Sequence, residues 1–387
     1  MRKKLLLAFV TLYVAYLAGG ITLIYTGVIG RLYFLPLFAI KGPDRSTFAA
    51  DGPWLFYKSS AITRKQIIPR GRALVVQTDS LPTTQDQLLT CYITETGTAF
   101  SFPRHPFPTV QPTHYAMPAK MLVLSDIEGN FKGLQQVLTG TGVTDAHDRW
   151  HFGTGHLVFV GDMFDRGLQV TECLWLLYKL EYEAEQAGGK VHFLLGNHEV
   201  MNLTGNYQYV RHKYRHNADS LHLPYAQWYT PATELGRWLR SKNVIERIGS
   251  TLFVHGGISP QVLAQHLSLD QLNQLTRQGL DAPNHHALQG TAKLISQSDL
   301  SPDWYRGIAL EEASAQHVQQ VLRTYGAKTM VIGHTPSEQI HTLYQHQVIA
   351  IDIPHQAHTE QGFMQALWWE NGTFAVIDQQ RRKQLLN

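Results

Sequence analysis

Cysteine is scarce in this chain. Only two of its 387 residues, Cys91 and Cys173, are cysteines. This excludes a disulfide framework and a metal cluster held by thiolates. Cys173 falls on the apolar face of an expected helix, where a buried and inert thiol is expected. The chain also has no internal repeat and no low-complexity tract, so it is not built from repeated units.

An excess of charge of one sign is lacking as well. The formal net charge is +3, and charged residues make up 16% of the chain. So small a net charge gives no electrostatic reason to expect a nucleic acid as partner. Histidine, in contrast, is abundant with 20 residues, which suits transition-metal sites even if most of them have no such role. The length allows two or three domains and a sizeable core.

A long apolar run lies close to the N-terminus. Residues 5–30 carry no charged side chain, and they follow the basic cluster Arg2-Lys3-Lys4. About twenty apolar residues suffice to span a bilayer, so the run predicts a transmembrane signal anchor within residues 1–41. The basic cluster should stay in the cytoplasm, which places the rest of the chain in the periplasm or the extracellular space.

Two features of this region leave an alternative open. Arg31, Lys41 and Arg45 on the other flank reduce the charge asymmetry on which the orientation depends. Ala18 and Gly20 are small enough for the cleavage site of a signal peptide, and cleavage would give a secreted protein. Cleavage there would, however, leave an apolar stretch as the new terminus, which favours a retained anchor.

The composition changes twice beyond the anchor. Residues 42–102 hold short strand-like runs between turn residues, best seen at 54–57, 73–76 and 88–94, and they predict a small antiparallel β module. Residues 103–118 contain five prolines and predict a stiff, extended linker. The catalytic domain is therefore expected over residues 119–387. A second apolar run, at 32–40, is too short to span a membrane and is expected at its interface.

The chemistry centres on the stretch Gly161-Asp162-Met163-Phe164-Asp165-Arg166-Gly167, which follows the apolar run 157–160. Four consecutive apolar residues predict a strand buried on both faces, and the glycine after it lets the backbone turn and approach a ligand. Asp162 would then lie at the carboxyl end of the strand, where α/β sheets usually bind ligands.

Four other apolar runs end in the same way, beside Asp, Asn, His or Glu and nearly always a glycine. One such junction is an ordinary polar turn as readily as a site, but five in one chain are hard to attribute to chance. The other four are 121–124 before Ser125-Asp126-Ile127-Glu128-Gly129-Asn130, 191–195 before Gly196-Asn197-His198-Glu199, 251–254 before His255-Gly256-Gly257, and 329–332 before Gly333-His334-Thr335.

Helical patterns separate the first three of these strands. Residues 130–139 and 173–187 carry apolar side chains at helical spacing, and Gly188-Gly189 ends the second pattern. Alternating strands and helices predict parallel strand pairing with right-handed crossovers. Mostly helical segments are expected from 260 to 325, and strands again at 347–352, 363–369 and 373–377.

An aromatic and basic insertion, residues 205–229, interrupts this alternation. Its position between two site-bearing strands suits a lid or a wall of a substrate groove. A surface excursion packed by its own aromatic side chains is equally consistent with the sequence.

Carboxylate, amide and imidazole groups without cysteine suit a pair of divalent ions such as Mn²⁺, Fe²⁺ or Zn²⁺. Two ions about 3.5 to 4 Å apart need a ligand that touches both, and Asp162 is the candidate. Such ions would lower the pKa of a shared water and neutralise phosphate oxygens, so that hydroxide can attack phosphorus. Arg166 could hold those oxygens, and His198 paired with Asp165 could protonate the leaving oxygen. Taken alone, Asp165 and Arg166 would equally suit a salt bridge within a turn.

These motifs resemble the motif set of the phosphoprotein phosphatases within the calcineurin-like metallophosphoesterases. The resemblance covers residues 120–378 and includes all the junctions from Gly161 onward. Ser301-Pro302-Asp303-Trp304-Tyr305-Arg306-Gly307 is similar to a motif of the bacterial branch called Shewanella-like phosphatases. The resemblance implies an α/β (α+β) fold in which helices flank a central β-sandwich, with two divalent metal ions at the strand ends.

The family pattern implies the metal ligands position by position. Asp126 and Asp162 would bind the first ion. Asp162 would also bind the second ion, together with Asn197, His255 and His334.

The same pattern implies the remaining roles. His198 and Asp165 would form the acid pair, and Arg166 with Arg306 would clamp the phosphate, although Arg306 could instead be structural. One position departs from the family, because the first motif reads Asp-x-His there and Asp126-Ile127-Glu128 here. A first site with Glu128 and no imidazole would favour Mn²⁺ or Mg²⁺ over Zn²⁺ and iron, and it predicts an alkaline pH optimum. The alternative is a weakened, half-occupied site.

Three functions are consistent with these motifs. The leading hypothesis is a dinuclear-metal phosphomonoesterase that acts on phosphoserine, phosphothreonine or phosphotyrosine in proteins or peptides. A second is hydrolysis of a small phosphoester such as a dinucleoside polyphosphate, for which the aromatic insertion would stack a base. A third is a catalytically weakened, membrane-tethered binding module, with Glu128 as the mark of decay.

Overall fold

The computed structural model describes residues 2–26, 31–35, 38–41, 44–58, 61–83, 87–105, 108–282 and 288–386. Residues 36 and 37 of the short apolar run and residues 106 and 107 of the predicted linker lie outside this part. The chain folds as two compact units, Met1–Thr47 and Phe48–Asn387, and each is described by itself.

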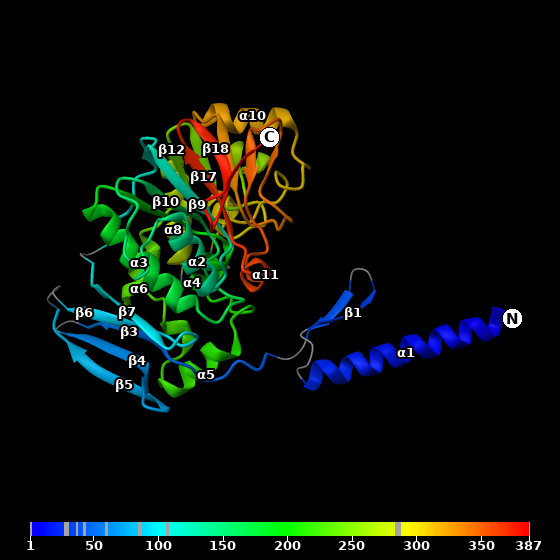
Figure 1. Ribbon diagram of the computed structural model, residues 1–387. Helices are drawn as coiled ribbons and strands as arrows, with labels where there is room; N and C mark the ends of the chain where they lie inside the picture. The colour runs from blue at the N-terminus through cyan, green and yellow to red at the C-terminus, as the bar shows by residue number, and fades with distance from the viewer. Residues whose placement is uncertain are drawn as a thin grey trace. The chain divides into compact units, whose positions relative to one another are not determined.

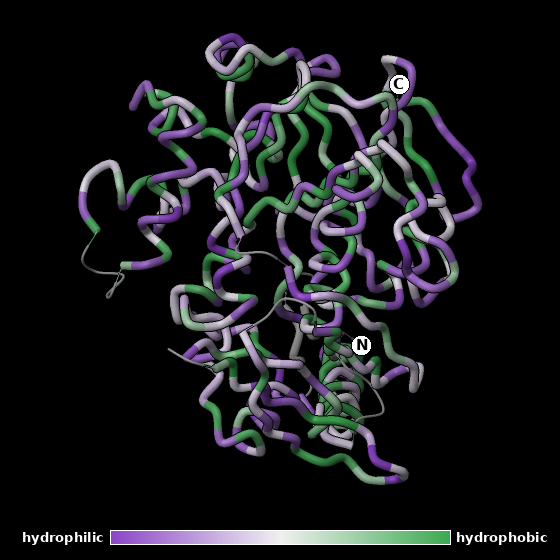
Figure 2. Tube along the Cα trace, turned by 90° about the vertical axis from the view of Figure 1, so that its left-hand side faces the viewer, coloured by the Kyte–Doolittle hydropathy of each residue, from purple (hydrophilic) through white to green (hydrophobic). Residues whose placement is uncertain are grey.

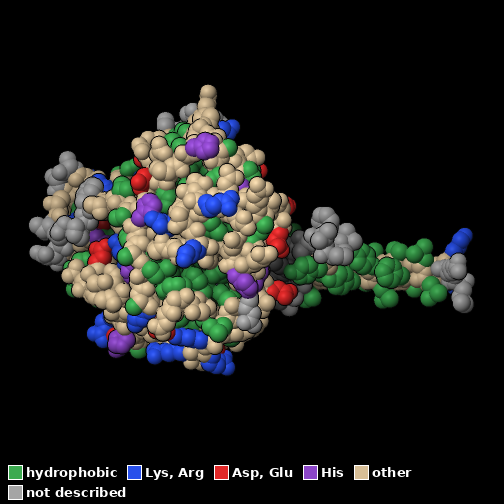
Figure 3. All heavy atoms as spheres, turned by 90° about the horizontal axis from the view of Figure 1, so that it is seen from above, with side chains coloured by type: hydrophobic (Ala, Val, Ile, Leu, Met, Phe, Trp, Pro, Cys, Tyr) green, Lys and Arg blue, Asp and Glu red, His purple; other side chains and the backbone are tan. Residues whose placement is uncertain are grey.

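The N-terminal unit holds the helix α1 (Arg2–Thr26) and a hairpin of β1 (Arg31–Leu35) and β2 (Phe38–Lys41). The helix is long and apolar enough to cross a membrane, and its hydrophobic side chains, such as Leu6 and Leu12, are exposed (Figure 3). Exposing so much apolar surface to water is unfavourable in free energy, whereas a lipid bilayer would accommodate it. A signal sequence near an N-terminus has the same length and composition.

The larger unit is built on two mixed sheets (Figure 1). The first sheet has the order β11 (Lys190–Leu194), β10 (His156–Val160), β9 (Lys120–Leu124), β17 (Gln365–Glu370), β18 (Thr373–Asp378), β19 (Lys383–Leu385). The second has the order β15 (His341–Leu343), β16 (Val348–Ala350), β14 (Thr329–Ile332), β13 (Thr251–Val254), β12 (Ile245–Ile248), β8 (His114–Tyr115). Parallel pairing of β9 with β10 and of β10 with β11 confirms the expected arrangement, and β13, β14 and β16 are likewise parallel.

Alternating side chains on each central strand explain why the runs are apolar throughout. Val123 and Val158 of the first sheet and Val331 of the second belong to one buried cluster between the sheets. Their neighbours Leu122 and Leu157 point to the opposite face and pack in a different cluster. Because successive side chains of a strand point to opposite faces, a strand covered on both sides needs apolar residues at every position. Figure 2 shows these strands as hydrophobic segments in the interior.

Helices cover both outer faces of the sandwich. Over the first sheet lie α2 (Phe131–Thr141) and α3 (Val170–Gln186), as the helical spacing predicted. Asn130 caps α2, since its side chain accepts the Gly133 N–H at 3.0 Å. Helix α11 (His355–Glu360) packs on α2. The helices packed on the second sheet are α7 (Pro260–Leu263), α8 (Leu269–Leu280), α9 (Gly290–Ser296) and α10 (Ala315–Thr324).

Strands from residues 51–103 form two small antiparallel sheets, as predicted for the β module. They are β3 (Asp51–Tyr57), β4 (Ile62–Arg70) and β5 (Ala73–Leu81) in one sheet, and β6 (Leu88–Ile93) and β7 (Thr98–Pro103) in the other. Their core is shared with the sandwich, because Phe102 packs on Trp175 of α3 with ring centroids 4.9 Å apart. The domain boundaries expected from the sequence stay a prediction, but the hydrophobic core is continuous from the strands β3 to β7 into the sandwich.

The aromatic insertion forms α5 (His212–Ser220) and the short 3₁₀ helix η1 (Tyr225–Gln227), between α4 (Asn197–Thr204) and α6 (Glu234–Arg240). Its aromatic side chains pack on one another and on β3: Trp228 lies 4.1 Å from Trp54 and 5.0 Å from Tyr225, centroid to centroid. Tyr209 differs from them, because 43% of it is exposed. The insertion is therefore packed by its own aromatics, and one of them remains at the surface.

Candidate metal centre

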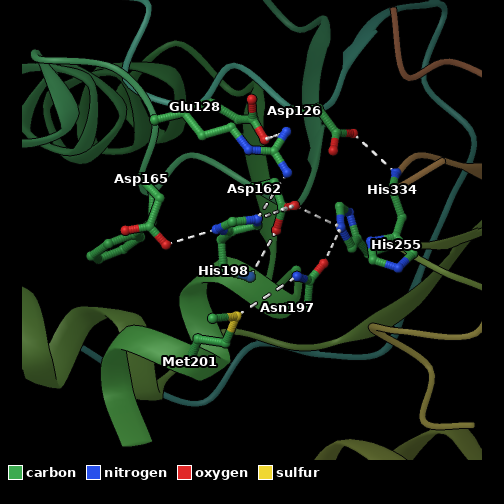
Figure 4. Close-up of polar contacts among 12 residues, drawn as sticks. Asp126, Glu128, Asp162, Asp165, Asn197, His198, Met201, His255 and His334 are labelled. Carbon is green, nitrogen blue, oxygen red and sulfur yellow. Dashed lines mark hydrogen bonds and ion pairs between the residues drawn. The ribbon is translucent and has the colours of Figure 1, made fainter. Parts of the chain in front are cut away.

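The loops after five central strands meet at one end of the sandwich (Figure 4). The first sheet carries Asp126 after β9, Asp162 after β10 and Asn197 after β11, and the second carries His255 after β13 and His334 after β14. All five residues are buried. The residues predicted to bind metal are thus brought together from both sheets, although up to 208 positions separate them in the chain.

The tightest part of this cluster surrounds Asp162. Nε2 of His255 lies 3.1 Å from Oδ2 of Asp162 and 3.1 Å from Oδ1 of Asn197. Asp162, His255 and His334 each offer a ligand atom, and these atoms lie within 4.8 Å of one another. Asp126 joins the group by accepting the backbone N–H of His334 at Oδ2, 3.1 Å away.

Both imidazoles present a nitrogen suited to a metal. Nδ1 of His255 lies 2.6 Å from the carbonyl oxygen of Val160, and since a carbonyl only accepts, Nδ1 carries the proton. Burial by itself lowers the pKa of His255, but Asp162 and Asp126 outweigh it and raise the pKa to about 10, so Nε2 is the nitrogen that would release its proton to bind a metal. Nε2 of His334 is buried and has no hydrogen-bond partner among the described residues. A buried polar atom left without a partner is unfavourable, and a bound cation would satisfy it.

The backbone of the loops is held in an uncommon conformation. Asp126, Glu128 and Asp162 have φ of 53°, 49° and 58°, and Asp165 and His334 have φ of 69° and 67°. Left-handed backbone at residues other than glycine is strained, and such residues cluster at functional sites. The strain is opposed by hydrogen bonds between loops, as when the N–H of Asp126 donates to the Gly161 carbonyl at 3.0 Å.

Glu199 is the strongest of these restraints. Its buried carboxylate accepts the backbone N–H groups of Asp162 at 2.8 Å, Met163 at 2.7 Å and Gly196 at 2.7 Å. It therefore ties the loop that carries Asp162 to the loop that carries Asn197. The sequence motif contains Glu199, but only the structure reveals this role.

Only glycine fits beside the ligand side chains at three positions, because a Cβ there would clash with them. A Cβ on Gly161 would lie 2.6 Å from Nδ1 of His255, and Gly161 also has φ of 88°. A Cβ on Gly196 would lie 2.2 Å from Oδ1 of Asp162, and one on Gly333 would lie 2.6 Å from Oδ2 of Asp126. The glycines at the junctions thus allow backbone to lie directly against the ligand side chains.

His198 forms the predicted pair with Asp165. Nδ1 of His198 lies 2.7 Å from Oδ2 of Asp165, and Nε2 faces the cluster, 3.9 Å from Oδ2 of Asp162. Burial by itself lowers the pKa of His198, but the carboxylates of Asp162 and Asp165 outweigh it and raise the pKa to about 9. Asn202 supports the pair by donating to Oδ2 of Asp165 at 2.9 Å, and Tyr225 in turn donates to Asn202 at 2.8 Å. No motif in the sequence pointed to these roles of Asn202 and Tyr225.

Glu128 and Arg166 lie at the mouth of the site and form an ion pair with each other. Nη1 of Arg166 is 2.5 Å from Oε1 of Glu128, and its Nη2 is 3.4 Å from Nε2 of His198. Burial raises the pKa of Glu128 to about 8, although the guanidinium opposes this. Glu128 also shares a possible ligand group with Asp162 and His198. Tyr209 of the insertion lies beside them, its ring centroid 5.1 Å from that of His198.

Arg306 contacts the loop that carries His334, whereas Arg166 contacts Glu128 and His198. Its Nη1 donates to the carbonyl oxygen of His334 at 2.8 Å and to the hydroxyl of Thr335 at 3.2 Å. These contacts hold the loop that carries His334. They correspond to the structural alternative considered for Arg306, and its part in a phosphate clamp stays a prediction.

Asp352 is a further acidic residue of the site, and no sequence motif pointed to it. It follows β16, the parallel neighbour of β14, and it is buried. Burial, together with the nearby Asp126 and Glu128, raises its pKa to about 9. Burial similarly raises the pKa of Asp126 to about 6. Such a concentration of buried carboxyl groups favours binding of cations.

The residues present fit a pair of divalent ions. The donors are carboxylate and amide oxygens and imidazole nitrogens, without sulfur, which are the ligands of Mn²⁺, Fe²⁺, Zn²⁺ and Mg²⁺ sites. Asp162 belongs to both groups of candidate ligands, one with His255 and His334 and the other with Glu128 and His198. Its Oδ1 accepts the backbone N–H of His198, and its Oδ2 faces His255.

Comparison with known proteins gives one consistent result. A family model of the calcineurin-like phosphoesterases matches residues 119–338. Shewanella-like protein phosphatase 2 of Arabidopsis thaliana is 25% identical over an alignment of 294 residues, and the match covers 62% of this chain and 72% of that protein. Shewanella-like protein phosphatase 1 of Plasmodium berghei is 28% identical over an alignment of 264 residues, and the match covers 63% of this chain and 69% of that protein. The crystal structure of a cold-active protein-tyrosine phosphatase from a psychrophilic Shewanella species is 31% identical, with a TM-score of 0.77, and the match covers 87% of this chain and 99% of that one.

The pairing of His198 with Asp165 can be tested on the metal-free protein. Asp165→Asn removes a negative charge that favours the protonated imidazole, so the pKa of His198 should fall by about one to three units. NMR titration of the His198 ring, assigned with a His198→Gln variant, measures this shift. Asp145→Asn changes a carboxylate in a distant turn and should leave the pKa as it is. An unchanged pKa in Asp165→Asn would contradict the pairing.

Proposed function

This chain belongs to the calcineurin-like phosphoesterase family and is a metal-dependent phosphatase, and we propose that its substrates are phosphorylated proteins or peptides. The resemblance to the phosphoprotein phosphatases and to their Shewanella-like branch is confirmed by these matches. The substrate class is supported by the relatives, whose names describe protein phosphatases, one of them a protein-tyrosine phosphatase.

The ligand assignment that we propose follows the geometry. Asp126 and Asp162, with Glu128, would hold the first ion, and Asp162 with Asn197, His255 and His334 would hold the second. When bound, the ions supply Lewis acidity, which activates a water for attack and neutralises phosphoryl oxygens. The hydrogen bond from Nδ1 of His255 to the Val160 carbonyl orients the ring for this purpose.

The observation that carries the proposal is the orientation of His198. Asp165 holds Nδ1, so the remaining N–H is on Nε2 and faces the cluster of ligands. In the metal-free protein a pKa of about 9 keeps this imidazole protonated at neutral pH, and Asp165 lies 2.7 Å from Nδ1 to favour the charged form. It can therefore donate a proton to the poor leaving group of a serine, threonine or tyrosine phosphate. Arg166 presents its guanidinium next to Nε2, where it can contact phosphoryl oxygens.

The position of Tyr209 favours substrates with an aromatic group next to the phosphate. It is exposed, lies beside His198, and has the guanidinium of Arg166 6.0 Å from its ring centroid. A ring of the leaving group could stack there. The same face would suit a nucleobase, so a small phosphoester is the competing substrate.

Comparing substrates tests the proposed function. Phosphotyrosine, phosphoserine and phosphothreonine peptides should be hydrolysed faster than a dinucleoside polyphosphate, measured as kcat/KM for phosphate release. Asp162→Asn should lower kcat/KM by more than about a hundredfold, because the ligand shared by both ions is lost. Faster hydrolysis of the dinucleoside polyphosphate would favour the small-molecule function, and turnover that survives Asp162→Asn would contradict the site.

We further propose that Mn²⁺ is the preferred ion, because Glu128 replaces the imidazole expected in the first site. Harder oxygen ligands favour Mn²⁺ over Zn²⁺. Metal-stripped protein should regain more activity and bind more metal with Mn²⁺ than with Zn²⁺, and Glu128→His should shift both readouts toward Zn²⁺. The additional carboxylate should also raise the pKa of the attacking water and give an alkaline optimum. Full activity of the unaltered protein with Zn²⁺ alone would refute this preference.

We also propose that α1 anchors the chain in a membrane, with the phosphatase unit outside the cytoplasm. Its exposed apolar surface and the basic cluster before it support this proposal. In a bacterial host, the full chain should stay in the membrane pellet after alkaline carbonate extraction, and protease added to spheroplasts should digest the phosphatase unit. Release of a protein whose N-terminus lies near residue 20 would show instead that the segment is a cleaved signal peptide.

A further inference from the structure

A basic pocket opens at the end of the first sheet that lies away from the metal centre. Its volume is about 480 Å³, within the range of pockets that bind ligands. Lys120, the first residue of β9, and Glu370, the last residue of β17, are paired across the two strands and line this pocket. The loop with Asp126 follows the other end of β9, so about 13 Å of strand separates it from the pocket. The pocket is therefore separate from the site that binds the phosphorylated residue.

Two aromatic rings and two lysines build one side of the pocket. Phe152 and Trp368 are buried, and their ring centroids lie 5.4 Å apart. Nζ of Lys120 lies 4.3 Å from the centroid of the Phe152 ring, and Nζ of Lys383 lies 4.6 Å from that of Trp368. Cation–π contacts of this kind position an ammonium group without neutralising its charge.

A third cation of the pocket, Arg381, is presented by a tight turn. Asp378 closes this turn by accepting the backbone N–H of Arg382 at 2.9 Å. Nε of Arg381 donates to the carbonyl oxygen of Gly140 in the last turn of α2, at 3.0 Å. A Cβ on Gly142, which ends α2, would lie 2.6 Å from Nη2 of Arg381. The glycine thus gives the guanidinium its place, and the hydrogen bond fixes its orientation.

Positive charge is left over in this pocket. Its described lining has the three cations Lys120, Lys383 and Arg381 and a single carboxylate, Glu370. Glu370 is already bonded to Lys383 at 2.6 Å and to the indole N–H of Trp368 at 3.3 Å, and these bonds hold its pKa below the usual range. Among the described residues, neither Lys120 nor Arg381 forms an ion pair with a carboxylate. Two cations that are held in place without a partner favour an anionic ligand.

The size and lining of the pocket favour acidic side chains as that ligand. A pocket of this volume takes a group larger than a single ion. Its aromatic rings offer contact to methylene groups, and its ammonium and guanidinium groups offer charge-assisted hydrogen bonds to carboxylates. A protein substrate is also long enough to contact the metal centre and this pocket at the same time.

We propose that this pocket binds an acidic segment of the phosphoprotein substrate, at a distance from the phosphorylated residue. The proposal rests on the proposed function, because it presumes a protein or peptide substrate. It goes further in naming a second contact that selects among phosphoproteins. Once the phosphorylated residue is bound, a tethered segment is present at a high effective concentration, so a few exposed ion pairs suffice to lower KM.

Kinetics of the full chain with Mn²⁺ test this contact. Two phosphotyrosine peptides carry a tail of Glu in one and of Gln in the other, joined by about twelve Gly and Ser residues with an r.m.s. length of roughly 20 Å. Each is made with the tail before and after the phosphotyrosine. In one of these orientations or in both, the Glu peptide should have a KM about three- to tenfold lower at low ionic strength, with a similar kcat. The difference should shrink at about 0.5 M salt, because exposed ion pairs are screened.

Charge reversal assigns the effect to the pocket. Lys120→Glu and, independently, Arg381→Glu should remove the advantage of the Glu peptide. Arg323→Glu makes the same change of charge at an exposed residue of α10, outside the lining of the pocket, and should keep the advantage. All three variants should hydrolyse p-nitrophenyl phosphate, which has no tail, as the unaltered protein does. An advantage that survives both pocket variants would overturn the proposal.

Binding of the tail without phosphotyrosine separates this proposal from the proposed function. By fluorescence anisotropy, a labelled Glu peptide should bind the unaltered protein and Arg323→Glu, and at least about fivefold more weakly to Lys120→Glu. Equal KM values for the Glu and Gln peptides in both orientations would overturn the acidic-segment site and leave the phosphopeptide function intact. Binding of citrate that Lys120→Glu abolishes, without binding of the Glu peptide, would assign the pocket to a small free anion and overturn the proposal. Hydrolysis of p-nitrophenyl phosphate without hydrolysis of any phosphopeptide would overturn the proposed function and the substrate role of the pocket together.

Discussion

The geometry of the metal centre depends on the buried carboxylate of Glu199. By accepting N–H groups from Asp162 and Met163 as well as from Gly196 in its own segment, it joins the loop after β10 to the start of α4. This contact supports Asp162 in left-handed backbone, with Oδ1 accepting the backbone N–H of His198 and Oδ2 facing His255. Without it, the buried N–H groups would lack partners and the strained conformation would have less support.

Opposite charges organise the rest of the centre in two groups. Around Asp162, burial would raise the pKa, but the neighbouring imidazoles of His255 and His198 hold it well below its usual range. This carboxylate is therefore ionised and able to hold cations. Farther out, Glu128 contacts Arg166, with Oε1 2.5 Å from Nη1. The residue that departs from the family pattern is thus linked to the arginine expected to contact phosphate, so changing Glu128 affects both metal binding and the availability of Arg166.

The insertion packs on the β module and reaches residues of the metal centre. Packing of Trp228 on Trp54 fixes the insertion to β3, while Tyr209 stays exposed beside His198. Tyr225 reaches from the insertion to Asn202 and so supports Asp165. The insertion at residues 205–229 therefore contributes to the orientation of the pair formed by Asp165 and His198. On another side, Trp304 packs edge-on against His334.

The sequence by itself determined the central strands, the flanking helices, and the residue types that end each strand. It could do so because burial on two faces requires uninterrupted apolar runs, helices require apolar spacing near 3.6, and backbone packed against ligands requires glycine. Only the tertiary structure decided which loops meet, that Glu199 joins two of them, that Arg306 holds the loop of His334, and that Asp352 is buried near the site. It also decided that Trp54 and Phe102 share a core with α3. These contacts join residues far apart in the chain, and they depend on how sheets and helices pack, which no local pattern of side chains encodes.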